Sequence, residues 1–303
     1  MHQTPSILTA TALTLLSLVA GLRVSAQPRG PELYRQGVQL LQSERYSQAL
    51  ATFDRVVQQN PRYAPGYSGR CAAFFALGNG SVALENCNQA ILLDPNLAVA
   101  YIHRGNVYLA FGDLEAAFAD AEQSLVADPK VPMPGAFLIL GQVALEEADF
   151  ETALDELDKA ILLDTNLAQA YQIRGQVYQA LANEEAAIAD FVRALRLDPR
   201  LTPPPGVQEA VVNQLLLDGQ AKLDQNELGA ALADFNLALS LNPQAAGAYN
   251  GRGLVLRAQG NEAAAIAEFE RALELDENNV VAQEQLAELR PPTPNSCPAA
   301  TSY

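Results

Sequence analysis

The sequence predicts an all-α protein built from seven copies of a helical hairpin, followed by one further helix. Two observations lead to this fold class. A pattern of 34 residues recurs through most of the chain, and its clearest copy, residues 168–201, reads AQAYQIRGQVYQALANEEAAIADFVRALRLDPRL. Within each half of that copy, apolar residues follow the i, i+3, i+4, i+7 spacing of an amphipathic helix. A single hairpin cannot bury its apolar face alone, so we expect neighbouring copies to stack.

Small residues recur at fixed positions of the pattern, counted with Ala168 as position 1. A small side chain at positions 8 and 20 lets the two helix backbones of a hairpin cross closely, while large residues at positions 4, 11 and 24 fill the wider ends. Position 8 is Gly37, Cys71, Gly105, Gly141, Gly175, Gly219 and Gly253, and position 20 is Ala49, Ala83, Ala117, Ala153, Ala187, Ala231 and Ala265. Proline at position 32 of most copies ends the second helix, because it disfavours helical geometry in the residue before it.

These residues resemble the tetratricopeptide repeat (TPR) family, and the resemblance covers residues 31–290. It implies a right-handed superhelical solenoid of seven TPR-like hairpins with a C-terminal capping helix. It also implies that the first helices of the hairpins line a concave groove that binds other proteins. No cofactor and no catalytic residue belong to this expectation.

The N-terminal residues 1–26 differ from the repeats. They contain no acidic residue, residues 7–22 are largely apolar, and Val24, Ser25 and Ala26 form a small-residue cleavage pattern. This composition is typical of a secretory signal peptide cut before Gln27, although the first residues carry no lysine or arginine. The alternative is an uncleaved membrane anchor, for which the apolar run is short. Cleavage would place the protein in the periplasm or outside the cell.

The remaining boundaries follow from the repeats. Residues 27–29 are a linker, 30–201 hold repeats one to five, 212–290 hold repeats six and seven with the capping helix, and 291–303 are expected to be a disordered tail. A proline-rich insertion, residues 202–211, separates repeats five and six. We expect a short extended link and then a first helix lengthened at its N-terminal end, since proline is tolerated in a first helical turn. The insertion is either a tolerated surface feature or a hinge.

The charge argues against nucleic acid and anionic membranes as partners. The chain has 19 basic and 35 acidic residues, a formal net charge of −16, and no basic cluster. Catalysis finds little support, because the two histidines are His2 and His103 and no cysteine or histidine spacing matches a metal site. We interpret His103 as a packed or solvated repeat residue. The sequence therefore predicts neither an enzyme nor a cofactor or metal.

Cys71 and Cys87 occupy positions 8 and 24 of repeat two and point into the contact between its two helices. In an exported protein they could form a disulfide. The alternative is a pair of buried thiols that act as small apolar residues. Cys297 lies in the tail.

Arginine at position 7 suggests a recurrent ion pair. Arg104, Arg174 and Arg252 occur in repeats that carry an acidic residue at position 23, namely Asp120, Asp190 and Glu268. Repeat two breaks the pattern, with Arg70 and Asn86 at those positions. We interpret these arginines as structural, linking the helices of one repeat or of neighbouring repeats, with a modest contribution from each exposed pair.

In the family, the groove is lined chiefly by positions 2, 5, 9 and 12. Position 9 supplies four consecutive amides, Asn106, Gln142, Gln176 and Gln220; repeat five adds Gln172 and Gln179; and position 12 supplies the apolar Phe75, Leu109 and Leu145. A carboxamide both donates and accepts hydrogen bonds, so a ladder of amides could pair with a peptide backbone. The alternative is that these residues are simply uncharged and solvated. Family members that hold chaperone C-termini use basic groove residues, and position 5 here supplies no lysine, so we do not expect that activity.

The function predicted from these features is an exported scaffold or adaptor that binds a protein or peptide in the groove. One alternative is a structural component of an envelope assembly that packs through its convex face or edges. A weaker alternative is a non-catalytic recognition subunit of an enzyme complex. The sequence names no partner.

Overall fold

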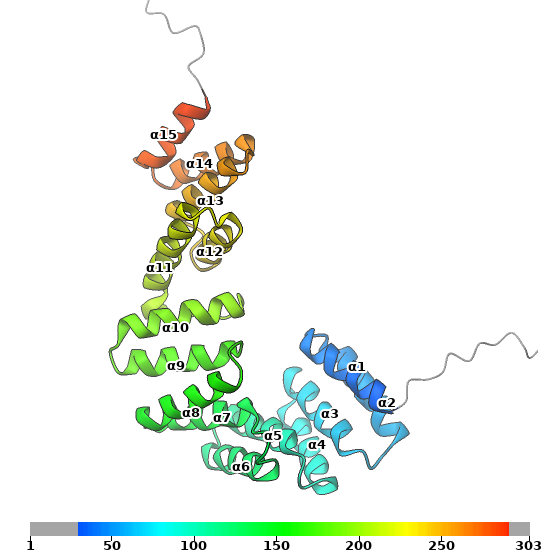
Figure 1. The fold of residues 1–303 in the computed structure, drawn as a ribbon. Coiled ribbons are helices and arrows are strands. Elements are labelled where there is room, and N and C mark those ends of the chain that lie inside the picture. Colours follow the sequence, from blue (N-terminus) through cyan, green and yellow to red (C-terminus); the bar gives the residue numbers. More distant parts are fainter. Residues whose placement is uncertain (1–29, 291–303) are drawn as a thin grey trace, which may run out of the picture. The chain divides into compact units, whose positions relative to one another are not determined.

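A computed structural model describes residues 30–290, which form fifteen α-helices and no β-strand. The predicted signal peptide and C-terminal tail lie outside these residues. The predicted all-α class is thus confirmed for the described part of the chain (Figure 1). The chain divides into two compact units, one ending at Val107 and the other beginning at Tyr108.

The first unit holds repeats one and two and the start of repeat three. Its helices pack in sequence order, α1 on α2, α2 on α3 and α3 on α4. Their bounds are α1 Gly30–Gln42, α2 Tyr46–Gln59, α3 Ala64–Ala76, α4 Gly80–Leu93 and α5 Ala98–Phe111, the last of which continues past Val107.

The second unit holds the remaining helices, again as hairpins packed on their sequence neighbours (Figure 1). Their bounds are α6 Leu114–Ala127, α7 Pro134–Glu146, α8 Phe150–Leu163, α9 Ala168–Ala180, α10 Glu184–Leu197, α11 Pro205–Asp224, α12 Leu228–Leu241, α13 Ala246–Ala258, α14 Glu262–Leu275 and α15 Val280–Leu289. Helix α15 packs on α14, and Ala282 on α15 is fully buried beside Phe269. None of the helices within residues 30–290 is both long and apolar enough to cross a membrane.

In repeats one, five, six and seven, a glycine on the first helix receives a phenylalanine ring from the second. A Cβ atom added at Gly219 would lie 2.7 Å from the Phe235 ring, and one added at Gly175 would lie 2.9 Å from that of Phe191. Such distances are shorter than van der Waals contact, so only glycine allows the helices to approach this closely. The glycine at position 8 and the large residue at position 24 therefore form one packing unit.

Repeat two replaces this unit with a covalent bond. Cys71 on α3 and Cys87 on α4 are joined by a disulfide, with Cα atoms 5.3 Å apart. Both residues are fully buried, together with Ala83 and Val107. The bond fills the place that a glycine and a phenylalanine share elsewhere.

The turns inside the hairpins have a common geometry at position 15. This residue has a positive φ in every repeat, as expected for the left-handed residue that ends an α-helix. The seven residues are Glu44, Gly78, Gly112, Ala148, Ala182, Asn226 and Gly260. Only three are glycine, so the sequence did not show the positive φ at this position.

The predicted arginine pairs are confirmed in repeats five and seven. Arg174 Nε lies 2.7 Å from Asp190 Oδ2, and Arg252 Nη2 lies 2.6 Å from Glu268 Oε1. Each arginine also reaches back to position 25 of the preceding repeat, where Arg174 Nη1 lies 2.5 Å from Asp158. Hydrogen bonds to Asp190 and Asp158 raise the pKa of Arg174, although burial opposes them. The arginines therefore tie consecutive hairpins together.

The insertion is largely helical. Helix α11 begins at Pro205 and has 20 residues, whereas the other helices have 10 to 14. Val207 and Val211, on its added N-terminal turns, are buried in a cluster with Val192 and Leu195 of α10. The insertion thus extends the hydrophobic core between repeats five and six.

Candidate partner-binding groove

The first helices of repeats six and seven line a groove. A pocket of about 460 Å³ lies against α11 and α13, with Phe235 of α12 and Val281 of α15 at its wall. The side chains come from the repeat positions that the family uses for binding. Position 2 supplies Asn213 and Gly247, position 5 supplies Leu216 and Asn250, and position 9 supplies Gln220 and Leu254.

Gly247 keeps the middle of this groove open. A Cβ atom there would lie 3.3 Å from Leu216 Cδ1, so a larger residue would press on that leucine. Leu217, which follows Leu216 on α11, is 66% exposed and also lines the pocket. An apolar strip is therefore available to a ligand between the polar Asn213 and Gln220.

Asn250 leaves a hydrogen-bond acceptor unused at the wall of the groove. The residue is 8% exposed, and its Nδ2 donates to Asn279 Oδ1 at 2.7 Å. Asn279 Oδ1 also accepts from the Ala282 amide at the start of α15, so Asn250 must present its NH₂ group to it. Within the described residues, Asn250 Oδ1 is buried without a partner. A buried acceptor in this state costs about 1–3 kcal/mol.

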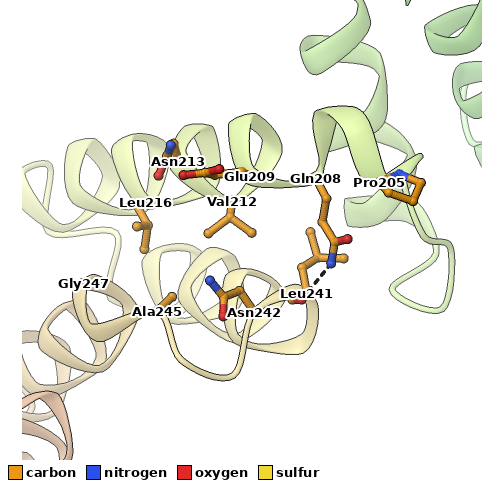
Figure 2. A pocket seen from close by; sticks show the side chains of 10 residues that line it. All are labelled: Pro205, Gln208, Glu209, Val212, Asn213, Leu216, Leu241, Asn242, Ala245 and Gly247. Carbon is orange, nitrogen blue, oxygen red and sulfur yellow. Dashed lines mark hydrogen bonds between the residues drawn. The ribbon is translucent and has the colours of Figure 1, made fainter. Parts of the chain in front are cut away.

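The lengthened α11 adds a second pocket at the upstream end of the groove. It has a volume of about 390 Å³ and shares Asn213, Leu216 and Gly247 with the first pocket. Figure 2 shows Val212 and Leu216 pointing from α11 toward Asn242 and Ala245. Because the two pockets share these residues, they form one continuous groove along α11.

Two hydrogen bonds organise the polar edge of this groove. Gln208 Nε2, on the added part of α11, donates to the Leu241 carbonyl at 2.8 Å (Figure 2). Gln220 Nε2 donates to Asp224 Oδ1 at 2.8 Å. The Oε1 of the same Gln220 amide therefore points away from Asp224. The exposed Glu209 carboxylate is the charged group that lines the upstream pocket.

The glutamines of repeat five lie against the insertion. Gln172 Nε2 donates to the Thr202 carbonyl at 3.4 Å, and a Cβ atom added at Gly206 would lie 3.7 Å from Gln179 Nε2. Gln142 and Gln176 are partly buried on α7 and α9. The predicted amides of the second unit therefore have different surroundings, and Gln220 lines the pocket between α11 and α13.

The apolar residues predicted for the groove contribute to the core. Phe75 is partly buried against the cluster that contains Cys71 and Cys87. Leu145 is likewise packed on the cluster around Leu157, and Leu109 is partly buried on α5. Asn106, on the same helix, is partly buried in the first unit.

Sequence reasoning did not single out Asn213, Asn250 or Gln208. Asn250 had a detectable signal, because position 5 is apolar in repeats four and six, at Leu138 and Leu216. Gln208 had none, since it precedes the first position of its repeat and only the longer helix brings it to the groove.

His103 is packed within the first unit. Its Nδ1 lies 2.9 Å from Ser68 Oγ and 3.1 Å from the Ser68 carbonyl oxygen. Burial lowers the pKa of His103 to about 4, against the opposing effect of the hydrogen bond to the Ser68 backbone. Across residues 30–290, no group of three or more His, Cys, Asp or Glu side chains could hold a metal ion.

Comparisons with known proteins agree with this architecture. Family models described as tetratricopeptide repeat match residues 98–131, 168–201 and 216–280. Human protein O-mannosyl-transferase TMTC1 is 26% identical over 153 residues, a match that spans 50% of this chain but only 17% of that protein.

Two solved structures have a similar fold. A thermophilic TPR protein from Thermus thermophilus matches with a TM-score of 0.50 and 22% identity, over 56% of this chain and 92% of that one. PilW, a type IV pilus biogenesis factor, matches with a TM-score of 0.50 and 15% identity, over 85% of this chain and 98% of that one. Proteins of this class are generally non-catalytic scaffolds for protein–protein interaction. The recurring hairpins, the matches to the repeat models and the similar folds together identify the chain as a tetratricopeptide-repeat protein.

Proposed function

We propose that this protein is a non-catalytic adaptor that holds an extended segment of a partner protein in the groove of repeats six and seven. The observation that carries the proposal is the continuous groove along α11, where positions 2, 5 and 9 of two successive repeats line joined pockets.

The chemistry of the groove suggests how the segment would be held. Asn213 and Gln220 offer amides that can pair with main-chain groups irrespective of the partner's side chains. Leu216, Leu217 and Leu254 offer apolar contact for one or two of those side chains. The segment would therefore be largely uncharged or basic, since the chain carries a net charge of −16.

We further propose that the protein acts outside the cytoplasm after removal of residues 1–26. The composition of that segment supports this localisation, and so does the Cys71–Cys87 disulfide, which persists in oxidising compartments. The N-terminal residue of the purified protein, read by mass spectrometry, tests the proposal. Gln27 is the expected result, and retention of Met1 would contradict cleavage.

The groove is tested by affinity capture from a native envelope extract, using the mature chain beside a variant with Gln142→Ala, Gln176→Ala and Gln220→Ala. A second variant carries Asn213→Ala and Gln220→Ala, the two exposed amides of the repeat six groove. Gln123→Ala, at an exposed position of α6, is the matched control. A partner retained by the parent and the control, and lost by the second variant, is the expected outcome. Retention of that partner by all variants with unchanged affinity would refute groove binding.

Comparison of the first two variants locates the interface further. Because Gln142 and Gln176 lie outside the two joined pockets, they should add little to the effect of Gln220→Ala alone. A large additional loss would extend the interface onto repeats four and five, as the predicted amide ladder requires.

One observation favours a second function, assembly through the outer face. The most exposed large apolar residues of α6 and α8 are Val126 (69%) and Leu162 (82%), and both occupy position 29 of their repeats. Repeats six and seven have Ser240 and Glu274 there. Replacing Val126 and Leu162 with serine would abolish capture of a partner that packs on this face, while a groove ligand would still bind.

A further inference from the structure

Four junctions between repeats share one polar contact. The arginine at position 7 reaches the residue at position 25 of the preceding repeat, which is an aspartate or an asparagine. The pairs are Arg70–Asp54 at 3.1 Å, Arg104–Asn88 at 2.7 Å, Arg174–Asp158 at 2.5 Å and Arg252–Asn236 at 3.1 Å. Each arginine thus places a cation over the second helix of the repeat before it.

Two junctions lack an arginine at position 7: the one between repeats three and four, where the residue is Leu140, and the one between repeats five and six. Position 7 of repeat six is Asp218 instead of arginine, and position 25 of repeat five is the apolar Val192. A pocket of about 660 Å³ lies here between α10 and α11. Its lining residues are Glu184, Glu185, Ile188, Ala189, Val192, Arg196, Gln214 and Asp218.

One cation, Arg196, also lines this pocket, and it is paired with two aspartates. Arg196, from the last turn of α10, lies 2.5 Å from Asp218 and 2.9 Å from Asp234, a carboxylate that is only 2% exposed. Lys222 also pairs with Asp234. Burial acts to lower the pKa of Arg196, but the two aspartates outweigh it and the pKa lies above its ordinary value. Arg196 is therefore committed to Asp218 and Asp234.

The remaining acids leave this pocket negative. Glu184 and Glu185 occupy positions 17 and 18, and repeat five is the copy with acidic residues at both. Both are exposed in the first turn of α10, where the helix dipole favours a negative charge. No ion pair engages either of them within the described part of the chain. The partly buried Ile188 and the exposed Ala189 give the pocket an apolar surface beside these two carboxylates.

We propose that the pocket between α10 and α11 receives an arginine or lysine side chain from a protein partner. The methylene stem would lie on Ile188 and Ala189, and the charged head would meet Glu184 and Glu185. A partner would thereby pair the two glutamates, which Arg196 leaves without an ion pair. Gln214 and Asp218 line this pocket, whereas Asn213, Leu217 and Gln220 line the groove, so the site is independent of the proposed groove function.

Charge complementarity selects this occupant over the alternatives. A second copy of the chain also carries a charge of −16, and an anionic lipid surface would be repelled by the two glutamates. A cationic side chain with an apolar stem satisfies both the charge and the apolar wall of the pocket. The planar guanidinium of arginine can donate hydrogen bonds to both carboxylates. The ammonium of lysine would act as a point charge.

The test is an NMR titration of the purified, ¹⁵N-labelled chain with the peptide acetyl-Gly-Arg-Gly-amide. Expected are saturable shifts confined to amides of α10 and α11. Glu184→Gln with Glu185→Gln should weaken binding about three- to tenfold, as expected for two partly exposed ionic contacts. The control variant carries Glu151→Gln and Glu262→Gln, which remove the same charge from exposed positions 18 and 17 of other repeats. It should bind like the parent.

A blocking variant completes the test. Ala189→Arg places a guanidinium at the exposed edge of the same pocket and should abolish the shifts in α10 and α11 while the helical circular dichroism is retained. Shifts spread evenly over the acidic surface, or weakened equally in both glutamine variants, would overturn the proposal. So would the absence of shifts at millimolar peptide, or unchanged binding to the Ala189→Arg variant.

Discussion

At the residue scale, the fold depends on how closely two helices can cross. Gly219 shows this most clearly, because the Phe235 ring fills the space where its side chain would be. The pairing of positions 8 and 24 was predictable from sequence, since both recur in most copies. In repeat four, Leu157 takes the place of phenylalanine beside Gly141, so this contact does not require an aromatic ring.

Gly219→Ala should therefore destabilise the protein. The added methyl group forces the Phe235 ring or the backbone of α11 to move, at a cost of about 1–3 kcal/mol. Gly229→Ala is the matched control, because nothing lies within 4 Å of its added Cβ atom and alanine favours a helix. Urea denaturation followed by circular dichroism measures both. Equal midpoints for the two variants would refute the packing argument.

His103 links stability to pH through one buried ring. The folded protein holds its pKa at about 4, below the ordinary 6.5. The unfolded chain therefore binds a proton that the folded protein does not, and stability should be lost as pH falls from 6.5 toward 4. The linked free energy is at most about 3 kcal/mol for a shift of this size.

Comparison with His103→Gln isolates this contribution from the many carboxylates. The parent should lose more stability than the variant between pH 6.5 and 4.5, as measured by urea unfolding at each pH. Parallel pH profiles for the two proteins would show that His103 is protonated equally in the folded and unfolded states.

Some side-chain contacts could be predicted from the repeat positions, and others could not. The pairs Arg174–Asp190 and Arg252–Glu268 followed from the repeat positions. The unused acceptor of Asn250 did not, because it depends on Asn279 at the N-terminus of another helix. The amide environments of Gln172 and Gln179 depend on the inserted segment, whose path no repeat pattern describes.

At the element scale, repeat two is a hairpin in which a disulfide takes the place of ring packing. It closes a loop with a sequence separation of 16 residues between Cys71 and Cys87. The chain-entropy model gives about 3 kcal/mol of stabilisation for a loop of this length. Sequence placed both cysteines at the helix contact but could not supply the geometry of the bond.

Reduction should therefore loosen α3 and α4 selectively. Hydrogen exchange in those helices should accelerate on addition of reductant, while α11 to α14 keep their protection. A variant with Cys71→Gly and Cys87→Phe restores the pairing found at Gly37 and Phe53, and it should be insensitive to reductant. Unchanged exchange in reduced parent protein would show that the bond adds no stability.

Helix α11 is the element that departs most from the repeat pattern. Its added turns bury Val207 and Val211, create the upstream pocket through Gln208 and Glu209, and leave the pocket between α10 and α11. Proline at the start of the insertion indicated a helix N-terminus, as Pro205 confirms. The two pockets require three-dimensional packing, so the sequence did not predict them.

At the scale of the whole molecule, the chain offers two kinds of surface within its second unit. The groove along α11 is polar at its edges, apolar along its middle and contains an unpaired acceptor. The outer positions Val126 and Leu162 are apolar and exposed. Leu217 in the groove is also well exposed, at 66%, and has the same side chain as Leu162. These two leucines therefore provide a matched comparison.

The most direct test of groove binding is photo-crosslinking in intact cells, with benzoyl-phenylalanine in place of Leu217 or of Leu162. If the groove binds the partner, a crosslinked product is expected from position 217 and a much weaker one from position 162. The Leu217 product should also disappear when Asn213→Ala and Gln220→Ala are introduced. A partner crosslinked from position 162 alone would contradict groove binding and assign the interaction to the outer face.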